Sequence, residues 1–575
     1  MDFRLGSWLI RPGLNQIVRA SRSSRLTPKS MEVLVCLAKR GGEVVSKAAL
    51  LQEAWPGTHV TDDAVIKCIG ELRRVFGTAR DEPPVIETIS KRGYRVVAPV
   101  IWETGDTVDG KVGSTPIRRI AVLPLTELSG NPKQEYFADG MTEELITELA
   151  QIDAWQVISR TSVMRYKRTK KPLPDIARDL AVDTVLEGTV FQSGSRVRIT
   201  AQLIEAATDA HLWSGSFERE LSDVLWLQRE IAQAVAAKLS VEFSPHQAVR
   251  PLRARTVDPR AYEAYLKGMF HLSKFTPEGF ERGMKYLQRA VETDHPDPLA
   301  YAALALGYAM MGHDRFPDAF SRAKEAACRS LDLGVPLAEA YAVLAMVEIY
   351  WDWDIRSAGR DFRRALELNP SLAETRRHYS WYLRLLDQRQ EGIEEMKRAA
   401  SLDPVSPQIA ADLAWQYLFE GQFDAALAEA EKSLEFNPAF AQGLAIAGWV
   451  YAEKGEFQEA IAAQQKAAET VNWKWPLGRT YALMGCNAEA RAIAAEVERN
   501  PGPLDQWGLA VIYAALGDND KTLRWLNAAY ESRFSWMPWN SSVAVPSQDV
   551  FAAVRHDRRF QELIRRVALH GQGSD

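Results

Sequence analysis

The sequence predicts a multidomain protein in which a small α+β domain is followed by an α/β domain and then by an all-α stack of helix pairs. Near its start, a helix with one apolar stripe precedes a hairpin with a basic tip. Further on, buried strands alternate with helices, and beyond them prolines recur at an interval of 34 residues. Because single cores rarely grow past roughly 250–300 residues, a chain of 575 residues needs several of them.

The charge of the chain is unevenly distributed. The whole chain has a formal net charge of -5, whereas residues 1–101 carry 16 Lys and Arg against 10 Asp and Glu, a balance of +6. Residues 102–575 therefore sum to -11. A basic N-terminal segment on an otherwise acidic chain indicates that this segment alone binds an anion.

The head, residues 1–101, predicts three helices between short strands. Alternation over 3–10 and again over 16–19 is typical of antiparallel strands. Thr27, which precedes Pro28, and Ser46 are the N-caps expected for the first two helices. The third helix is expected to start near Thr61 or Asp62, and residues 86–97 to form a hairpin. The apolar stripe of the third helix consists of Val65, Ile69, Leu72 and Phe76.

These pieces together resemble the DNA-binding domain of OmpR/PhoB-type response regulators and CadC-like one-component activators. The resemblance spans about 95 residues and implies a winged helix-turn-helix, whose third helix enters the major groove while the hairpin reaches the backbone or minor groove. Ser30 and Ala49 depart from the family, which often places there a Glu that completes a capping box. The matching segments are Leu26–Lys29, Gly42–Ser46, Trp55–Gly57, Leu72–Arg74 and Arg92–Arg95.

The exposed face of the third helix and the hairpin tip supply the predicted DNA contacts. Lys67 and Arg74 would neutralise phosphates or bond to guanine edges, and Glu71 would accept from a cytosine amino group. Lys91 and Arg92 would add sequence-independent, salt-sensitive binding. An ordinary solvated helix face is the alternative, and the complete order of winged-helix pieces disfavours it. The predicted DNA-binding residues are Asp63, Lys67, Gly70, Glu71, Arg73, Arg74, Lys91, Arg92 and Tyr94.

Residues 117–250 predict an α/β domain. Segments 119–125 and 155–158 have the composition of buried strands, and 184–190 with 197–205 predicts a hairpin. A helix is expected to start at Gly140–Leu145, with Thr142 as its cap. Ala121–Leu125 and Tyr136–Thr142 resemble the TolB amino-terminal-like domain, which in some regulators is labelled adenylate cyclase by association.

No enzyme chemistry is predicted in this middle domain. No arrangement of Asp fits the paired carboxylates that hold two metal ions in common nucleotidyl cyclases, and no Gly-x-x-x-x-Gly-Lys-Ser/Thr phosphate loop occurs. Asp139-Gly140 could seat an anion, but a structural turn is favoured. His211 beside Trp213 is likewise interpreted as a packed or surface histidine. We therefore predict no catalytic residue, no metal site and no cofactor.

Residues 257–566 predict a repeat architecture. The motif Leu368-Asn369-Pro370 recurs around Pro404 and Pro438, and the 34-residue period resembles that of the tetratricopeptide repeat, a helix-turn-helix that ends at a proline. The resemblance implies a solenoid with a concave surface of the kind that takes peptides. Inter-repeat core is favoured over a binding role for most of the tryptophans Trp351, Trp353, Trp381, Trp415 and Trp449. The equally spaced prolines are Pro336, Pro370, Pro404 and Pro438.

The linker, the hydropathy and the cysteines bear on the cellular compartment of the protein. Residues 102–116, rich in Gly, Asp, Thr and Ser, are predicted to be a linker. No apolar stretch approaches the roughly 18–20 residues that a membrane helix needs. The four cysteines lie far apart in sequence, which disfavours a disulfide framework or a metal pair. The sequence thus predicts a cytoplasmic protein without a membrane partner.

These features predict a bacterial one-component transcriptional regulator that binds DNA sequence-specifically through a phosphorelay-like output domain. Because the winged helix begins at residue 1, no receiver domain is expected ahead of it. The predicted partners are double-stranded promoter DNA and, through the repeats, a protein or a second copy of the chain. Two alternatives stay open: a regulated nucleotide-processing enzyme in the middle domain, and a repeat scaffold whose winged helix no longer binds DNA. The balance of +6 in the head disfavours the second.

Overall fold

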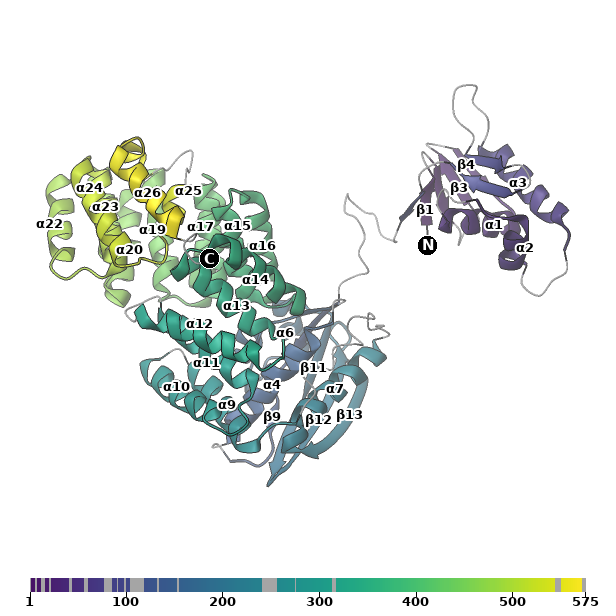
Figure 1. Ribbon diagram of the computed structural model, residues 1–575, viewed down its shortest axis with the longest axis horizontal. Coiled ribbons are helices and arrows are strands. Elements are labelled where there is room, and N and C mark those ends of the chain that lie inside the picture. The colour runs from purple at the N-terminus through teal and green to yellow at the C-terminus, as the bar shows by residue number, and fades with distance from the viewer. Residues whose placement is uncertain are drawn as a thin grey trace. The chain divides into compact units, whose positions relative to one another are not determined.

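The computed structural model (Figure 1) falls into two compact units, residues 1–117 and 118–575, which are described separately. The predicted linker lies outside the described residues except for 102 and 103. The described residues are 2–5, 8–11, 16–19, 22–40, 44–55, 60–76, 85–89, 92–97, 100–103, 118–131, 134–152, 155–239, 256–274, 276–312, 317–542 and 550–570.

The first unit carries two antiparallel sheets. The larger has the order β4-β3-β2-β1-β7, and its last strand pairs with its first so that Trp102 lies opposite Phe3. The smaller is the predicted hairpin of β5 (Ile86–Ile89) and β6 (Gly93–Val96). Strands over 3–10 and 16–19 are confirmed, whereas β4 and β7 were not predicted. The larger sheet consists of β1 (Asp2–Leu5), β2 (Trp8–Arg11), β3 (Gln16–Arg19), β4 (Arg22–Arg25) and β7 (Val100–Glu103).

Three helices, α1 (Pro28–Lys39), α2 (Lys47–Ala54) and α3 (Asp62–Phe76), complete the first unit. Both predicted caps are confirmed, since the Thr27 hydroxyl accepts from the Ser30 amide and the Ser46 hydroxyl from the Ala49 amide. The helices pack through apolar faces that include the fully buried Leu34, Leu50 and Leu72. This is the three-helix core that the apolar spacing predicted.

The second unit begins with a six-stranded mixed sheet of order β10-β8-β11-β12-β13, with β9 beside β11. The β11–β12 hairpin is confirmed, and β13 is a strand that was not predicted. The predicted start of the first helix was wrong. That helix begins at Glu135, and Thr142 lies buried inside it, where its hydroxyl donates to the Ala138 carbonyl and accepts from the Leu125 amide.

The elements of this α/β part are β8 (Arg118–Val122), β9 (Thr126–Glu127), α4 (Glu135–Leu149), β10 (Trp155–Val157), α5 (Arg160–Met164), α6 (Leu173–Leu180), β11 (Thr184–Ser193), β12 (Arg196–Glu205), β13 (Ala210–Glu220), η3 (Leu221–Asp223) and α7 (Val224–Lys238).

Helix pairs follow from residue 259 to residue 531, which confirms the predicted solenoid. Pro370, Pro404 and Pro438 each stand two positions after the end of a helix, at 368, 402 and 436, where a residue that cannot continue a helix is expected. The helices are α9 (Pro259–Leu272), α10 (Pro277–Val291), α11 (Pro298–Gly312), α12 (Pro317–Asp332), α13 (Ala338–Val347), α14 (Ile355–Leu368), α15 (Ala373–Leu385), α16 (Arg389–Leu402), α17 (Pro407–Phe419), α18 (Phe423–Phe436), α19 (Ala441–Lys454), α20 (Phe457–Val471), α21 (Trp475–Leu483), α22 (Asn487–Val497), α23 (Pro503–Ala515) and α24 (Asn519–Glu531).

Shorter elements interrupt and finish the repeats: the π-helical turn η4 (Glu348–Asp352), α25 (Trp539–Ser542), η5 (Ala552–Val554) and α26 (Arg558–His570). Across the described part of the chain, no helix has the length and apolar character needed to cross a membrane.

The sheet and the repeats are joined through the β10 side of the sheet. The Ser159 amide donates to the Leu402 carbonyl at 2.8 Å, and the Ser162 hydroxyl donates to Asp403 Oδ1 at 2.5 Å. The Arg119 guanidinium donates to the Ser401 carbonyl at 2.6 Å. The predicted α/β domain and solenoid therefore form one compact unit rather than two separate ones.

Candidate nucleic-acid interface

Helix α3 separates a buried face from an exposed face. Val65, Ile69 and Leu72 are at most 2% exposed and pack against the other helices of the first unit. Residues three and four apart lie on the same side of a helix, so the opposite side forms one continuous stripe. Its exposed residues are Asp63, Ile66, Lys67, Gly70, Arg73 and Arg74.

Lys67 and Arg74 are the cations that this stripe leaves available. No hydrogen bond or ion pair joins either side chain to another described residue of the chain. Seven residues separate them, so at a rise of 1.5 Å per residue they lie about 10 Å apart along the helix axis. Two unpaired cations on one helical face suit phosphates or guanine edges.

Ile66 is a site residue that the sequence analysis missed. Its side chain is 46% exposed in the middle of the stripe, next to Lys67. An apolar side chain in that position can contact the methyl group of thymine in the major groove. Its spacing of three residues from Asp63 and four from Gly70 was the available signal, and the sequence analysis assigned Ile66 to neither face of the helix.

Gly70 leaves the centre of the stripe open. A Cβ placed on it would meet no atom within 4 Å, so packing inside the first unit does not require glycine here. Glycine inside a helix costs roughly 0.5–1 kcal/mol relative to alanine. A residue that destabilises its helix without an internal reason fits a place where another molecule approaches closely.

The Glu71 side chain forms hydrogen bonds within the protein, at the start of α1. Its carboxylate accepts from the Thr27 amide at 2.9 Å, the Thr27 hydroxyl at 2.7 Å and the Ser30 hydroxyl at 2.6 Å. Burial alone would raise the pKa of Glu71, but the hydrogen bonds from Ser30 and Thr27 outweigh it and hold the pKa below its usual range. The carboxylate that the first helix lacks at Ser30 is thus supplied from α3.

Arg73 holds the hairpin against α3. Its guanidinium donates to the Ile86 carbonyl at 3.1 Å and to the Thr88 hydroxyl at 2.7 Å, both on β5. The same side chain cannot make those bonds and reach far into a DNA groove. The structure therefore places Arg73 as a support for the wing.

Tyr94 is also internal, because its side chain is 6% exposed and belongs to the core of the first unit. Its backbone exchanges two hydrogen bonds with Val45, at 2.8 and 3.0 Å, which tie the wing to the segment before α2. Gly93 has φ +140°, and a Cβ there would lie 1.9 Å from the Val45 carbonyl oxygen. Only glycine fits this crossing.

The predicted contact residues divide into two groups. Asp63, Lys67, Gly70 and Arg74 share the exposed face of α3, and Arg92 is exposed at the wing. Lys91 lies outside the described residues. The other three, Glu71, Arg73 and Tyr94, connect α3, the wing and α1 inside the unit.

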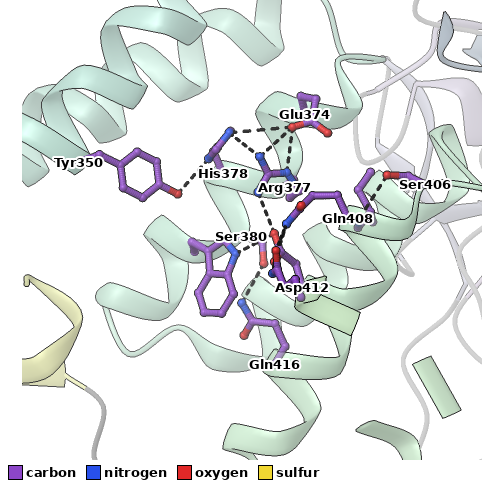
Figure 2. A network of polar contacts seen from close by, with 12 residues as sticks. Tyr350, Glu374, Arg377, His378, Ser380, Ser406, Gln408, Asp412 and Gln416 are labelled. Carbon is purple, nitrogen blue, oxygen red and sulfur yellow. Dashed lines mark hydrogen bonds and ion pairs between the residues drawn. The ribbon is translucent and has the colours of Figure 1, made fainter. Parts of the chain in front are cut away.

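A second polar cluster lies on the repeats, where Figure 2 shows polar side chains, Arg377 and Gln408 among them, converging on the carboxylate of Asp412. Asp412 on α17 accepts from Arg377 at 2.7 Å, Trp381 at 3.3 Å, Gln408 at 3.2 Å and Gln442 at 2.7 Å. A carboxylate offers about four lone-pair sites, so this one is saturated. The network ties three successive repeats together and leaves no capacity for a ligand at Asp412.

The tryptophans of the repeats are mostly packed. Trp353, Trp381 and Trp449 are at most 4% exposed. A later segment adds to them, since the Trp539 indole donates to the Trp381 carbonyl at 3.0 Å and Trp536 packs edge-on against Trp381 at 4.9 Å. Part of the surface formed by α13 and α15 is therefore covered by the chain itself.

Asp139 and Gly140, the residues of the middle domain that were considered for anion binding, have structural contacts. Asp139 and Gly140 lie within α4 rather than before it, and Asp139 is paired with Lys167 at 2.5 Å. A Cβ on Gly140 would lie 2.5 Å from Leu266, so this position packs against α9. Over the described ranges, no group of three His, Cys, Asp or Glu residues is placed to hold a metal ion.

Comparison with known proteins assigns the parts. Residues 21–96 match the family of transcriptional regulatory protein C-terminal domains. The first unit is an OmpR/PhoB-type winged helix. Residues 117–234 match the second domain of HilA/YgeH-like transcriptional regulators, and residues 441–470 match the tetratricopeptide repeat. The TolB-like resemblance of the middle domain stays a prediction.

Individual relatives carry related names. The chain is 23% identical to the transcriptional regulator HilA of Salmonella typhimurium over 384 residues, 66% of each chain. It is 35% identical to the transcriptional activator CadC of Escherichia coli K12 over 125 residues, 22% of this chain and 24% of CadC. A Rhizobium meliloti protein that carries the unproven name adenylate cyclase 3 is 34% identical over 187 residues, 32% of each chain.

The matched segments thus span between about a quarter and two thirds of these relatives. Among solved structures, the DNA-binding domain of E. coli CadC is 39% identical, with 18% of this chain and 95% of that domain covered and a TM-score of 0.17.

Proposed function

We propose that this chain is a cytoplasmic one-component transcriptional regulator that binds promoter DNA sequence-specifically through its winged helix. The observation that carries the proposal is the exposed stripe of α3, in which Lys67 and Arg74 form no hydrogen bond or ion pair with another described residue, while Glu71 bonds to the start of α1 and Arg73 bonds to the wing. A rigid helix that presents unpaired cations is suited to enter the major groove.

Each exposed residue has a distinct role in this proposal. Lys67 and Arg74 bond to phosphates or to guanine, and Ile66 contacts thymine methyl groups. Gly70 lets the helix lie close to the bases. Arg92, together with Lys91, contacts the backbone beside the groove and adds affinity without sequence preference.

The α/β domain and the repeats supply the input. Sensing and partner binding are assigned to this unit because tetratricopeptide repeats present extended surfaces for protein segments. A catalytic middle domain is disfavoured, since the buried Asp139 of α4 is paired with Lys167. We therefore assign the protein a binding role rather than an enzymatic one.

The test is DNA binding by the full chain to its own upstream region at several salt concentrations. Replacing Lys67 and Arg74 by alanine should lower affinity at least tenfold, and should reduce the slope of log K against log salt by about 2 if both contact phosphates. If they contact guanines, each loss costs about 1–3 kcal/mol and relaxes base preference instead.

A matched control removes the same charge elsewhere. Lys170 and Arg178 are exposed in the second unit, so the Lys170→Ala/Arg178→Ala variant has the same net charge without touching α3. It should bind as the unchanged chain does. Equal binding by the α3 variant and this control would contradict the residue assignment, and no salt-sensitive binding by any form would contradict the function.

A further inference from the structure

Strand β13 is an open edge of the sheet in the second unit. It is eleven residues long and pairs with β12 on one side. Within the described residues of this unit, no strand or backbone hydrogen bond covers its other side. Figure 1 shows β13 at the margin of the sheet away from the helical repeats. An uncovered edge presents a row of free backbone N–H and C=O groups.

The opposite edge of the same sheet, strand β10, is short and is covered by the repeats. β10 has only three residues, and the Val157 amide on it donates to the Ser371 hydroxyl of the repeats at 3.5 Å. Ser159, just beyond β10, donates to the Leu402 carbonyl. Among the residues that the structure describes, the short edge of the sheet is therefore covered and the long one is not.

The centre of this edge, Trp213–Phe217, lacks the usual protection against pairing. Proteins blunt such strands with charges, proline or covering elements. In β13 the segment 212–217 contains no charged residue and no proline, and acidic and basic residues occur only from Glu218 onward. A β-bulge lies near the start of β13, where Leu203 pairs with Trp213 and Ile204 with His211, so that Leu212 is the extra residue; from Trp213 onward the pairing with β12 is regular.

The sequence of β13 is nearly symmetric about Gly215. Ser214 and Ser216 flank it, and Trp213 and Phe217 follow on either side with rings 5.9 Å apart. Gly215 is also the midpoint of the strand. Gly215 leaves room for those two rings, since a Cβ on it would lie 2.6 Å from Trp213 and 2.7 Å from Phe217. An antiparallel copy centred there would place serine opposite serine and Trp213 opposite Phe217.

An exposed tryptophan stands beside this edge. Trp226 on α7 is 47% exposed. It lies one turn before Glu230, which forms an ion pair with Arg219 of β13 at 3.0 Å, so Trp226 is on the side of α7 that faces the strand. A second chain paired with β13 would cover it.

We propose that β13 pairs antiparallel with β13 of a second copy of this chain, centred on Gly215, and forms a two-fold dimer. The regular segment Trp213–Phe217 of each copy then pairs with that of the other. The two sheets become one, and no acidic residue lies opposite another. The inference concerns the second unit alone and stands apart from the DNA contacts of the first.

The experiment uses two double variants of the full chain that differ only in the sign of one charge. Ser214 and Ser216 are exposed on the face of the sheet away from α7, and they oppose Gln202 and Thr200 within the chain. In the proposed dimer, residue 214 of one copy faces residue 216 of the other. Ser214→Lys/Ser216→Lys therefore opposes like charges, and Ser214→Lys/Ser216→Glu opposes unlike ones.

Sedimentation equilibrium should show a dimer for the unchanged chain. The dissociation constant of the dimer should be at least about tenfold higher for the Lys/Lys variant, and within about threefold of the original value for the Lys/Glu variant. Amides of 212–217 should gain protection from hydrogen exchange as concentration rises. Lys67→Ala/Arg74→Ala should dimerise normally, which separates this result from any failure of DNA binding.

Several outcomes would overturn the proposal. They are a chain that is monomeric up to about 100 μM, a Lys/Lys variant that dimerises as well as the original, and a Lys/Glu variant as weak as Lys/Lys. Concentration-independent protection of 212–217 in a monomer would also overturn it, since another segment of the same chain would then cover β13.

Discussion

Replacing Glu71 distinguishes a structural residue from a base-contacting one. The sequence placed Glu71 on the DNA-facing side of α3, whereas its carboxylate accepts three hydrogen bonds from Thr27 and Ser30 at the start of α1. We expect Glu71→Ala to destabilise the first unit and to leave base preference unchanged.

The magnitude follows from what each donor loses. Thr27 is exposed and regains water, so its two bonds cost little. The Ser30 hydroxyl is fully buried, and leaving it without that acceptor costs about 1–3 kcal/mol. Loss of a carboxylate at a helix N-terminus costs a further 0.3–1 kcal/mol or so. We expect a destabilisation of about 2 kcal/mol, and about half of that for Glu71→Gln.

The pH dependence of the same contact follows from the lowered pKa of Glu71. A carboxyl whose pKa is lower in the folded than in the unfolded state stabilises above the unfolded value and loses that stabilisation as the pH falls through the folded one. The difference between the original and Glu71→Ala should therefore persist at pH 7 and shrink below about pH 4.5.

Hydrogen exchange of the α1 amides in the full chain, compared at pH 7 and at about pH 4, measures this difference on both sides of that range. Glu71→Ala should raise the rate of exchange in residues 28–39, whereas Arg74→Ala, on the same helix, should not. Selection of bound DNA sequences by both variants completes the assay. Unchanged exchange in Glu71→Ala together with an altered base preference would refute the structural assignment and restore Glu71 as a base contact.

Three further predictions follow from single contacts. Gly70→Ala should stabilise the first unit by about 0.5–1 kcal/mol in the same exchange assay, yet weaken DNA binding, because its Cβ is free inside the unit but faces the ligand. Arg73→Ala should loosen the wing, with faster exchange over 85–97 and weaker binding at unaltered base preference, since its bonds to Ile86 and Thr88 are lost. Burial raises the pKa of Asp403 to about 6, so the stability that its neutral form confers is lost as the pH rises from about 4 through 6. Denaturant unfolding should then show Asp403→Asn, which keeps an acceptor for Ser162, to be more stable than the original by about 2 kcal/mol at pH 7.5 and nearly equal at pH 4.

Much of the fold was predictable because its signals are local or periodic. Thr27 and Ser46 cap helices through atoms three residues away, and the prolines after α14, α16 and α18 recur with the repeat itself. The apolar stripe of α3 needs only the helical period. Each of these rests on short-range spacing that the sequence shows directly.

The remaining features depend on contacts between distant segments. Glu71 bonds to Thr27, which is 44 positions away in the sequence. The helical period alone placed Glu71 on the exposed face and could not show this contact with α1. Tyr94 was assigned to the wing surface, but its pairing with Val45 turns it inward. β13 was missed because its Ser-Gly-Ser centre has weak strand propensity, and pairing with β12 supplies what local preference lacks.

The central claim is that the exposed face of α3 contacts DNA bases, and selection of bound sequences from random double-stranded DNA by the full chain tests it most directly. The account predicts an enriched motif containing guanine and thymine positions. Lys67→Ala/Arg74→Ala should lose the guanine preference, Ile66→Ala should lose the thymine preference, and Lys170→Ala/Arg178→Ala should keep both. Bound DNA with no motif, or one motif shared unchanged by all these variants, would contradict it.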